Sequence, residues 1–200
     1  MDYLEDMEST EETKNRIMMA AMGRILQYGF NKTTMAEIAK DCNMSSANIY
    51  RFFESKGSIV AEMAKGCFRD KEDALREVTR RPGMSAAERL EELVLQTLRS
   101  GHAMICERPK ANEVIEYISV ERHDILAQHK EVKQSLVAEI LAEGKKSGEF
   151  DLQDIDTTAE AFLTATVFFA CPINFDKRPL EELEQEAKAV IDLLVRGLKK

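Results

Sequence analysis

The chain lacks the residues and patterns that mark several classes of protein. Its 200 residues include no tryptophan, four prolines and three histidines, and no stretch approaches the roughly 20 apolar residues of a membrane span. The four cysteines show no CxxC spacing, so we expect free thiols in a reducing cytoplasm. No Gly-rich phosphate loop, nucleophile elbow or paired Cys/His set is present in the sequence. These absences argue against an enzyme and predict neither a metal site nor a cofactor.

What the chain does contain is a helical pattern. Helix-forming residues are abundant, and no run of alternating β-branched residues indicates a strand. We therefore predict an all-α fold with a three-helix head, a larger helical body and about nine helices. The expected helices span about residues 13–28, 34–42, 45–53, 57–80, 86–106, 112–121, 124–144, 157–170 and 180–198.

The stretch from Thr34 to Phe53 has the pattern of two short helices joined by a tight turn. Thr34 and Glu37 have the spacing of a capping box. Asn43 lies where such a turn needs a left-handed backbone, and Ser45 is a natural N-cap for the second helix. This is the pattern of a helix-turn-helix, whose second helix enters the DNA major groove. On these residues alone, a helical hairpin without a DNA role stays open.

A longer pattern surrounds this motif. It consists of Arg16-Ile17, Ala20-Ala21, Tyr28-Gly29-Phe30, Thr33-Thr34, Glu37-Ile38-Ala39, Met44-Ser45, Ile49-Tyr50-Arg51-Phe52-Phe53 and Ser55-Lys56. In these residues the chain, from Arg16 through Met63, resembles the TetR family of one-component transcriptional regulators. Asn43 and Ala47 stand where that family often has glycine, and Arg24 stands where leucine is common. These departures leave the operator sequence open.

The net charge of −8 is unevenly distributed along the chain. Residues 1–13 hold six acids and no base, whereas residues 14–71 hold ten lysines and arginines against five acids. A basic head on an acidic body suits contact with DNA phosphates, because such contacts are local.

We divide the chain into an acidic mobile tail (1–12), a helix-turn-helix DNA-binding domain (13–62) and a helical ligand-binding and dimerisation domain (63–200). We expect a cytoplasmic protein with no membrane partner. The resemblance implies a homodimeric repressor that binds double-stranded operator DNA with an inverted repeat and is released by a small-molecule inducer. Met104, Ile105 and Phe162 indicate that this inducer is mainly apolar. The alternative is a helical adaptor that binds protein partners without DNA, against which the basic head argues.

We assign the DNA contacts to the second helix of the motif and its surroundings. The candidates for reading bases are Ser46, Ala47, Asn48 and Arg51. The candidates for binding phosphates are Thr33, Thr34, Ser45, Tyr50 and Lys56.

The ligand pocket is assigned by position, on helices that enclose the ligand in similar proteins. Its candidates are Phe68, Leu98, His102, Met104, Ile105, Tyr117, Phe162, Thr166 and Phe169. Phe162 and Phe169 are also expected on a dimer surface, on a helix that Asp156 caps and that is apolar on more than one side. His102 and Cys106 have a spacing that can bind a metal, but two ligands alone predict none.

Overall fold

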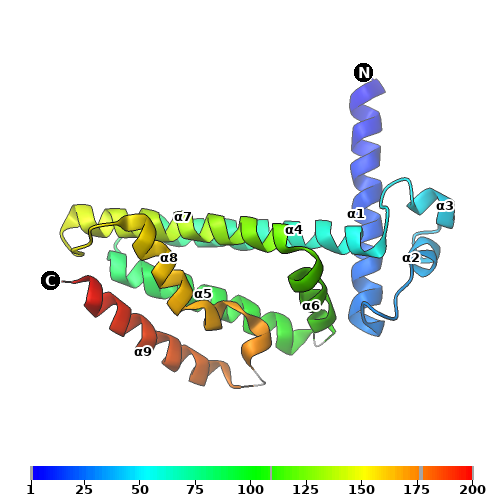
Figure 1. Ribbon diagram of the computed structural model, residues 1–200. Helices are drawn as coiled ribbons and strands as arrows, with labels where there is room; N and C mark the ends of the chain where they lie inside the picture. Colours follow the sequence, from blue (N-terminus) through cyan, green and yellow to red (C-terminus); the bar gives the residue numbers. More distant parts are fainter. Residues whose placement is uncertain (1, 109, 176–177, 200) are drawn as a thin grey trace. The chain divides into compact units, whose positions relative to one another are not determined.

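The computed structural model describes residues 2–108, 110–175 and 178–199, the first eight of them by backbone alone. In these ranges the regular elements are helices, with no strand, which confirms the all-α prediction (Figure 1). The elements are α1 (Asp2–Tyr28), α2 (Met35–Asp41), α3 (Ser46–Ile49), α4 (Lys56–Thr79), α5 (Ala86–Glu107), α6 (Ala111–Glu121), α7 (His123–Ser147), α8 (Ile155–Ala165), the 3-10 helices η1 (Val167–Ala170) and η2 (Pro172–Phe175), and α9 (Leu180–Leu198). Across the described ranges, no helix combines the length and the apolar character that crossing a bilayer requires.

The chain folds into two compact units. The first unit comprises residues 1–67 and 108–126, and the second comprises residues 68–107 and 127–200. Helices α4 and α7 each contribute residues to both units, whereas α6 belongs wholly to the first. The linear division near residue 62 did not anticipate that residues 108–126 join the first unit.

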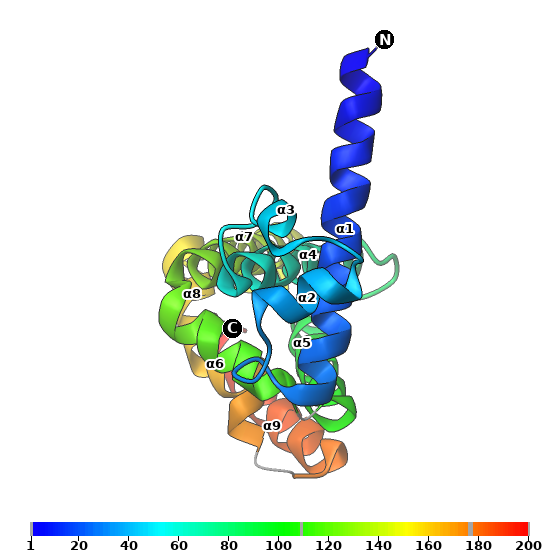
Figure 2. The same ribbon diagram turned by 90° about the vertical axis from the view of Figure 1, so that its right-hand side faces the viewer.

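In the first unit, α1, α2 and α3 pack around a small apolar core. Ile17, Ile38 and Ile49, one from each helix, are fully buried in it. Helix α1 begins at Asp2, so the expected start at Thr13 is wrong, and it extends well past α2 and α3 (Figures 1 and 2). No glycine or proline interrupts residues 2–12, and acids near a helix N-terminus favour the helix dipole. Of the expected mobile tail, Met1 lies outside the described residues.

In the second unit, α5 is the central helix and packs against α9, η1 and η2 (Figure 1). Its residues Leu90, Leu93 and Leu98 are essentially inaccessible to solvent. Apolar side chains from α4, α7, α8 and α9 complete this larger core. The expected spans of α5 and α9 agree with the structure to within one residue, because capping residues and prolines mark their ends.

Helix α8 is shorter than predicted. It begins at Ile155, and its cap is Asp154, whose side chain accepts the Thr157 N–H at 3.0 Å, so the prediction of Asp156 as the cap is wrong. It ends at Ala165, and the chain continues as η1 instead of reaching residue 170 as one helix. The break lies at Thr166, whose hydroxyl donates to the Phe162 carbonyl at 2.8 Å. Such back-bonding of a threonine bends helices.

Candidate functional site

The turn between α2 and α3 has the local structure that the sequence predicts. Thr34 Oγ1 accepts the Glu37 N–H at 3.3 Å, and a Glu37 carboxylate oxygen accepts the Thr34 N–H at 2.9 Å, which completes the capping box. Asn43 has a φ of 54°, in the left-handed region. Ser45 Oγ accepts the Asn48 N–H at 3.2 Å and so caps α3. The helix-turn-helix is therefore present, although α3 ends at Ile49 and not at the expected residue 53.

Helix α3 presents most of its surface to solvent. Ser46, Ala47 and Arg51 are exposed, and the Tyr50 side chain is 52% exposed, whereas Asn48 is half-buried. The buried Ile49 anchors the helix to the core. This exposed surface contains the residues that were predicted to read bases.

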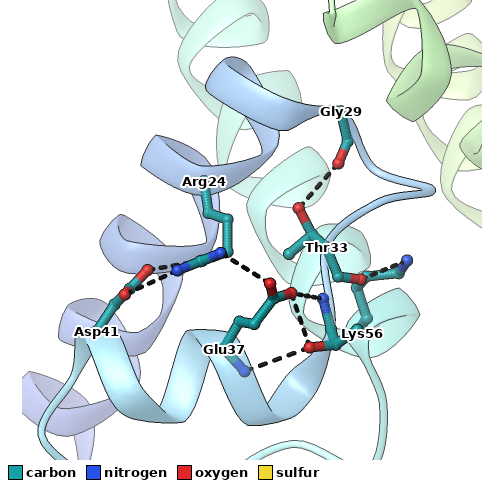
Figure 3. Close-up of polar contacts among 7 residues, drawn as sticks. Arg24, Gly29, Thr33, Glu37, Asp41 and Lys56 are labelled. Carbon is teal, nitrogen blue, oxygen red and sulfur yellow. Dashed lines mark hydrogen bonds and ion pairs between the residues drawn. The ribbon is translucent and has the colours of Figure 1, made fainter.

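Two of the predicted phosphate contacts have their donors engaged elsewhere. Thr33 is only 2% exposed, and its hydroxyl donates to the Gly29 carbonyl at 2.8 Å (Figure 3). Thr34 is exposed, but its N–H and its hydroxyl both donate to Glu37. We correct the prediction for Thr33, because a hydroxyl buried in this way has no proton left for a phosphate.

The Lys56 side chain turns into the first unit. Its ammonium donates to the Thr33 carbonyl at 2.8 Å (Figure 3). It also donates to the Phe30 carbonyl and lies 4.2 Å from the centroid of the Phe30 ring. Burial lowers the pKa of Lys56, and the charge of Glu113 partly opposes that shift. The prediction of Lys56 as a phosphate contact is corrected: this lysine holds the loop that leads into α2.

Arg24 joins α1 to both ends of α2 (Figure 3). Its Nε lies 2.8 Å from an Asp41 oxygen, and its Nη1 lies 3.1 Å from a Glu37 oxygen. The hydrogen bond from Arg24 lowers the pKa of Asp41, and that of Glu37 is lowered chiefly by its bonds to Thr34. The sequence had marked Arg24 only as a departure from the family pattern, and its partners are too far along the chain for a local signal.

Helix α6 is fixed to the loop after α1 through Glu113. One Glu113 oxygen accepts the Asn31 N–H at 2.9 Å. Gly29 has a φ of +95°, and a Cβ added there would lie 2.5 Å from the other oxygen of Glu113. The glycine is thus required both by the left-handed backbone and by the close approach of the carboxylate.

Tyr117 extends this contact to the start of α4. Its ring centroid lies 4.7 Å from that of Phe30, and a Cβ added to Gly57 would lie 2.0 Å from its hydroxyl oxygen. We call these contacts of Glu113 and Tyr117 with Gly29, Phe30, Asn31 and Gly57 the α6 seat. Tyr117 was predicted to line a ligand pocket in the body, but its ring instead packs within the first unit.

Comparison with known proteins places this geometry in a family. A family model described as "Bacterial regulatory proteins, tetR family" matches residues 17–63. A second, described as "Tetracyclin repressor-like, C-terminal domain", matches residues 86–191, more than half of the chain. The chain belongs to the TetR family. It is therefore a DNA-binding transcriptional regulator.

Individual TetR-family relatives differ in how much of the chain they cover. IcaR, the negative regulator of the biofilm operon icaADBC in Staphylococcus aureus, is 36% identical over 55 residues, which cover 28% of this chain and 30% of IcaR. A TetR-family regulator from Mesorhizobium loti covers 96% of this chain and 98% of its own, with a TM-score of 0.69 at 18% identity. FadR from Bacillus subtilis, in complex with stearoyl-CoA, covers 92% and 98%, with a TM-score of 0.67 at 18% identity. At these identities the two structures show the fold alone.

The second unit of this TetR-family protein brings together few of the predicted pocket residues. Thr166 and Phe169 line a cavity of about 10 Å³. Its other lining residues are Leu93, Val94, Thr97, Lys133, Leu163 and Ala170. The remaining candidates of this unit do not line it, and they are Phe68, Leu98, His102, Met104, Ile105 and Phe162. A cavity of this size has room for about one water molecule.

His102 and Cys106 lie close together on α5. The sulfur is 3.6 Å from His102 Nδ1, and His102 Nε2 is 3.0 Å from the Arg178 carbonyl oxygen. In the part of the chain that the structure describes, no three His, Cys, Asp or Glu side chains gather as a metal site. His102 thus links α5 to the segment before α9, whereas Cys106 is exposed and contacts His102.

A charged cluster in the second unit was not predicted. Glu72 of α4 accepts from His129 Nδ1 of α7 at 2.7 Å, and the His129 ring stacks on Phe68 at 4.3 Å. Burial lowers the pKa of His129 against the opposing effect of Glu72, and this favours the neutral ring. One turn further along α7, Lys133 is 9% exposed, and burial together with Lys71 lowers its pKa to about 8. Only the four-residue spacing of His129 and Lys133 is visible in the sequence, and it is not specific.

Proposed function

We propose that this regulator represses transcription by binding an inverted-repeat operator as a homodimer, and that a small molecule bound in its second unit releases it. The observation that carries the DNA-binding part is the exposed surface of α3, held by the capped turn and by the Arg24 contacts. IcaR, similar over its matched segment, is named a negative regulator, and FadR is named in complex with stearoyl-CoA. Both names support a repressor that responds to a ligand.

The DNA contacts that we propose lie on α3 and the residues directly before and after it. Ser46, Ala47, Asn48 and Arg51 would meet base edges, with Asn48 suited to adenine and Ala47 to a thymine methyl group. Tyr50 would meet a phosphate. Ser45 also remains a candidate, because its oxygen accepts from the backbone and its own hydroxyl proton is not used in that bond.

The homodimer surface that we propose differs from the predicted one. Phe162 and Phe169 are 3% and 4% exposed and belong to the core of the second unit, so we correct their assignment to the interface. Large apolar side chains remain exposed at Val167, Phe168 and Leu193, at 60%, 37% and 69%. Exposed apolar side chains on the last helices suit an isologous contact with a second copy.

The contacts of the α6 seat connect a movement of α6 to release of the protein from DNA. Helix α6 follows α5 directly in the chain and contacts the loop that Lys56 and Thr33 hold ahead of α2. A ligand that favours a different position of α6 would change the support of α2 and α3. Release requires only that the ligand bind the released state more tightly than the DNA-bound state.

Fluorescence anisotropy with labelled DNA from upstream of the gene tests the DNA-binding part. Wild type should bind this duplex, and Asn48→Ala should lose about 1–3 kcal/mol on it but little on random DNA. Lys188→Ala, an exposed basic residue of α9, is the control and should bind as wild type does. Failure of the wild type to prefer any upstream sequence would favour a protein-binding adaptor.

Sedimentation tests the dimer. Leu193→Glu should yield monomers, because the interface would bury an unpaired carboxylate. Lys188→Glu, on an exposed position of the same helix, is the matched control for added negative charge. A dimer that persists in Leu193→Glu would place the interface on another surface.

A further inference from the structure

Lys133 is a buried cation that lines a cavity. Its side chain is 9% exposed and contributes to the wall of the small cavity between α5 and the segment from α8 to η1. The hydroxyl-bearing residues Thr97 and Thr166 line the same cavity, and the rest of the wall is apolar. The cavity thus combines one positive charge with a mainly apolar surface.

No counter-charge meets this ammonium. Among the described residues, neither a hydrogen bond nor an ion pair joins the Lys133 ammonium to another group. The nearest acid of this cluster, Glu72, is engaged by His129, and Lys71 adds a second positive charge. From α5 and η1 the wall presents no charged side chain. Lys133 is 9% exposed and burial lowers its pKa, so its ammonium is largely removed from water and an acceptor brought into the cavity would stabilise it.

The two threonine hydroxyls cannot act as donors there. Thr97 Oγ1 donates to the Leu93 carbonyl at 2.8 Å, and Thr166 Oγ1 donates to the Phe162 carbonyl at 2.8 Å. A ligand group in this cavity therefore finds its hydrogen-bond donors on Lys133.

We propose that the inducer is an amphipathic carboxylic acid whose carboxylate pairs with Lys133 and whose apolar part packs among Leu93, Leu163 and Phe169. This inference rests on the proposed function, in which the second unit binds the inducer. A carboxylate matches the single uncompensated charge. A phosphate would bring further charge and would need donors that this wall does not offer.

The cavity must widen to admit such an acid, and η1 is the segment that can move. Phe169 and Ala170 of η1 form part of the wall, directly after the helix break at Thr166. The hydrogen bonds of 3-10 segments have poorer geometry than those of α-helices, and such segments often mark hinges. Movement of η1 would open the site while leaving Lys133 on α7 in place.

The test is calorimetry with three acids and their amides: hexanoate, decanoate and 4-butylbenzoate, each against the corresponding uncharged amide. The proteins are full-length wild type, Lys133→Met and, as a control, Lys146→Met, an exposed lysine on the same helix. At least one acid should bind wild type and Lys146→Met ten-fold or more tighter than its amide. Lys133→Met should bind the acid and the amide equally.

Proton linkage gives a readout specific to this lysine. With a pKa of about 8, Lys133 is half-protonated at pH 8, and pairing with a carboxylate raises its pKa, so binding should take up to about half a proton. Titrations in two buffers of different ionisation enthalpy measure this uptake, which should vanish in Lys133→Met. Failure of all three acids to bind, or a preference for the acid that persists in Lys133→Met, overturns the proposal.

Operator binding on the same samples separates this inference from the proposed function. If the acid preference depends on Lys133 but the acid leaves operator binding unchanged, the carboxylate site stands and the inducer role fails. If the acid and the amide release the operator equally, ligand control stands and the role of Lys133 fails.

Discussion

Each of the two units has a lysine whose side chain is directed into its interior, and the surroundings of these two lysines differ. In the first unit, the Lys56 ammonium donates to two carbonyls and lies over the Phe30 ring. In the second unit, the Lys133 ammonium lines a cavity and meets no acceptor among the described residues. A cation with hydrogen-bond acceptors can hold a loop in place, whereas a cation without an acceptor can bind an anionic ligand. The first unit is thus suited to present a constant surface, and the second to respond to a ligand.

The largest expected effect comes from removing the charge that has no partner. Lys133→Met should stabilise the protein at pH 7 by about 3 kcal/mol, because the pKa of Lys133 falls from 10.5 to about 8 on folding. At a pH between these two pKa values, Lys133 is protonated in the unfolded chain and deprotonated in the folded protein. The free energy of unfolding of the wild type therefore rises with pH. The advantage of Lys133→Met should therefore shrink between about pH 8 and pH 10.5. Urea unfolding of both proteins across this range measures it.

The control for this prediction is Lys146→Met, which changes an exposed lysine of the same helix and should alter stability little at any pH. If Lys133→Met instead destabilises the protein, the ammonium has a partner in solution, and the contrast between the two units fails.

The partnered lysine should behave in the opposite way. Lys56→Met should destabilise the protein by roughly 2 kcal/mol, because hydrogen bonds from a charged donor to two carbonyls are lost. Its operator affinity should keep the wild-type dependence on salt, since Lys56 makes no phosphate contact in our proposal. Binding at several salt concentrations checks this, and a slope reduced by about one unit would restore Lys56 as a phosphate contact.

Local patterns in the sequence predicted which helices are present but not the start of α1 or the ends of α3 and α8, and they could not predict what joins the helices. Thr34, Asn43 and Ser45 act within four residues of their partners, so spacing alone revealed the caps and the turn. In the sequence, Lys56 lies just before a predicted helix and Lys133 lies within one, and neither position indicates what the side chain meets. Their opposite roles depend on carbonyls, rings and helices that lie far away in the chain. For the same reason, Lys56 was predicted to contact a phosphate, whereas in the structure it supports the loop before α2.

The α6 seat allows a test, with a smaller expected effect, of how rigid the first unit is. Gly57 and Gly66 both lie in α4, but a Cβ at Gly57 would meet the Tyr117 hydroxyl at 2.0 Å, whereas nothing lies within 4 Å at Gly66. Gly66→Ala should stabilise the protein by about 0.5–1 kcal/mol, as expected for a helix interior. Gly57→Ala should instead destabilise it by about 1 kcal/mol through crowding. Thermal unfolding compares the two variants.

Removal of the nearest crowding atom, the Tyr117 hydroxyl oxygen, should reduce the cost of Gly57→Ala. In a Tyr117→Phe background the hydroxyl is absent, and Gly57→Ala should then cost less than it does in wild type. Equal costs in the two backgrounds would show that α6 does not rest against Gly57 in solution.

The smallest expected effect concerns the ion pairs of Arg24. As with Lys133, a lowered pKa makes stability rise with pH, but here the dependence falls in the acid range and comes from a stabilising pair. Arg24 lowers the pKa of Asp41, so the stability that this pair contributes is present above the ordinary pKa of 3.8 and is lost as the pH falls further. Arg24→Leu, which introduces the residue common in the family, should therefore make stability less sensitive to acid below about pH 4. The effect should be small and should weaken in high salt, because water and ions screen exposed charges. Urea midpoints between pH 2.5 and pH 6, at low and high salt, measure it for both proteins. If Arg24→Leu keeps the full acid sensitivity of the wild type, the Arg24–Asp41 pair does not hold α2 against α1, and the constancy of the first unit must come from its apolar core alone.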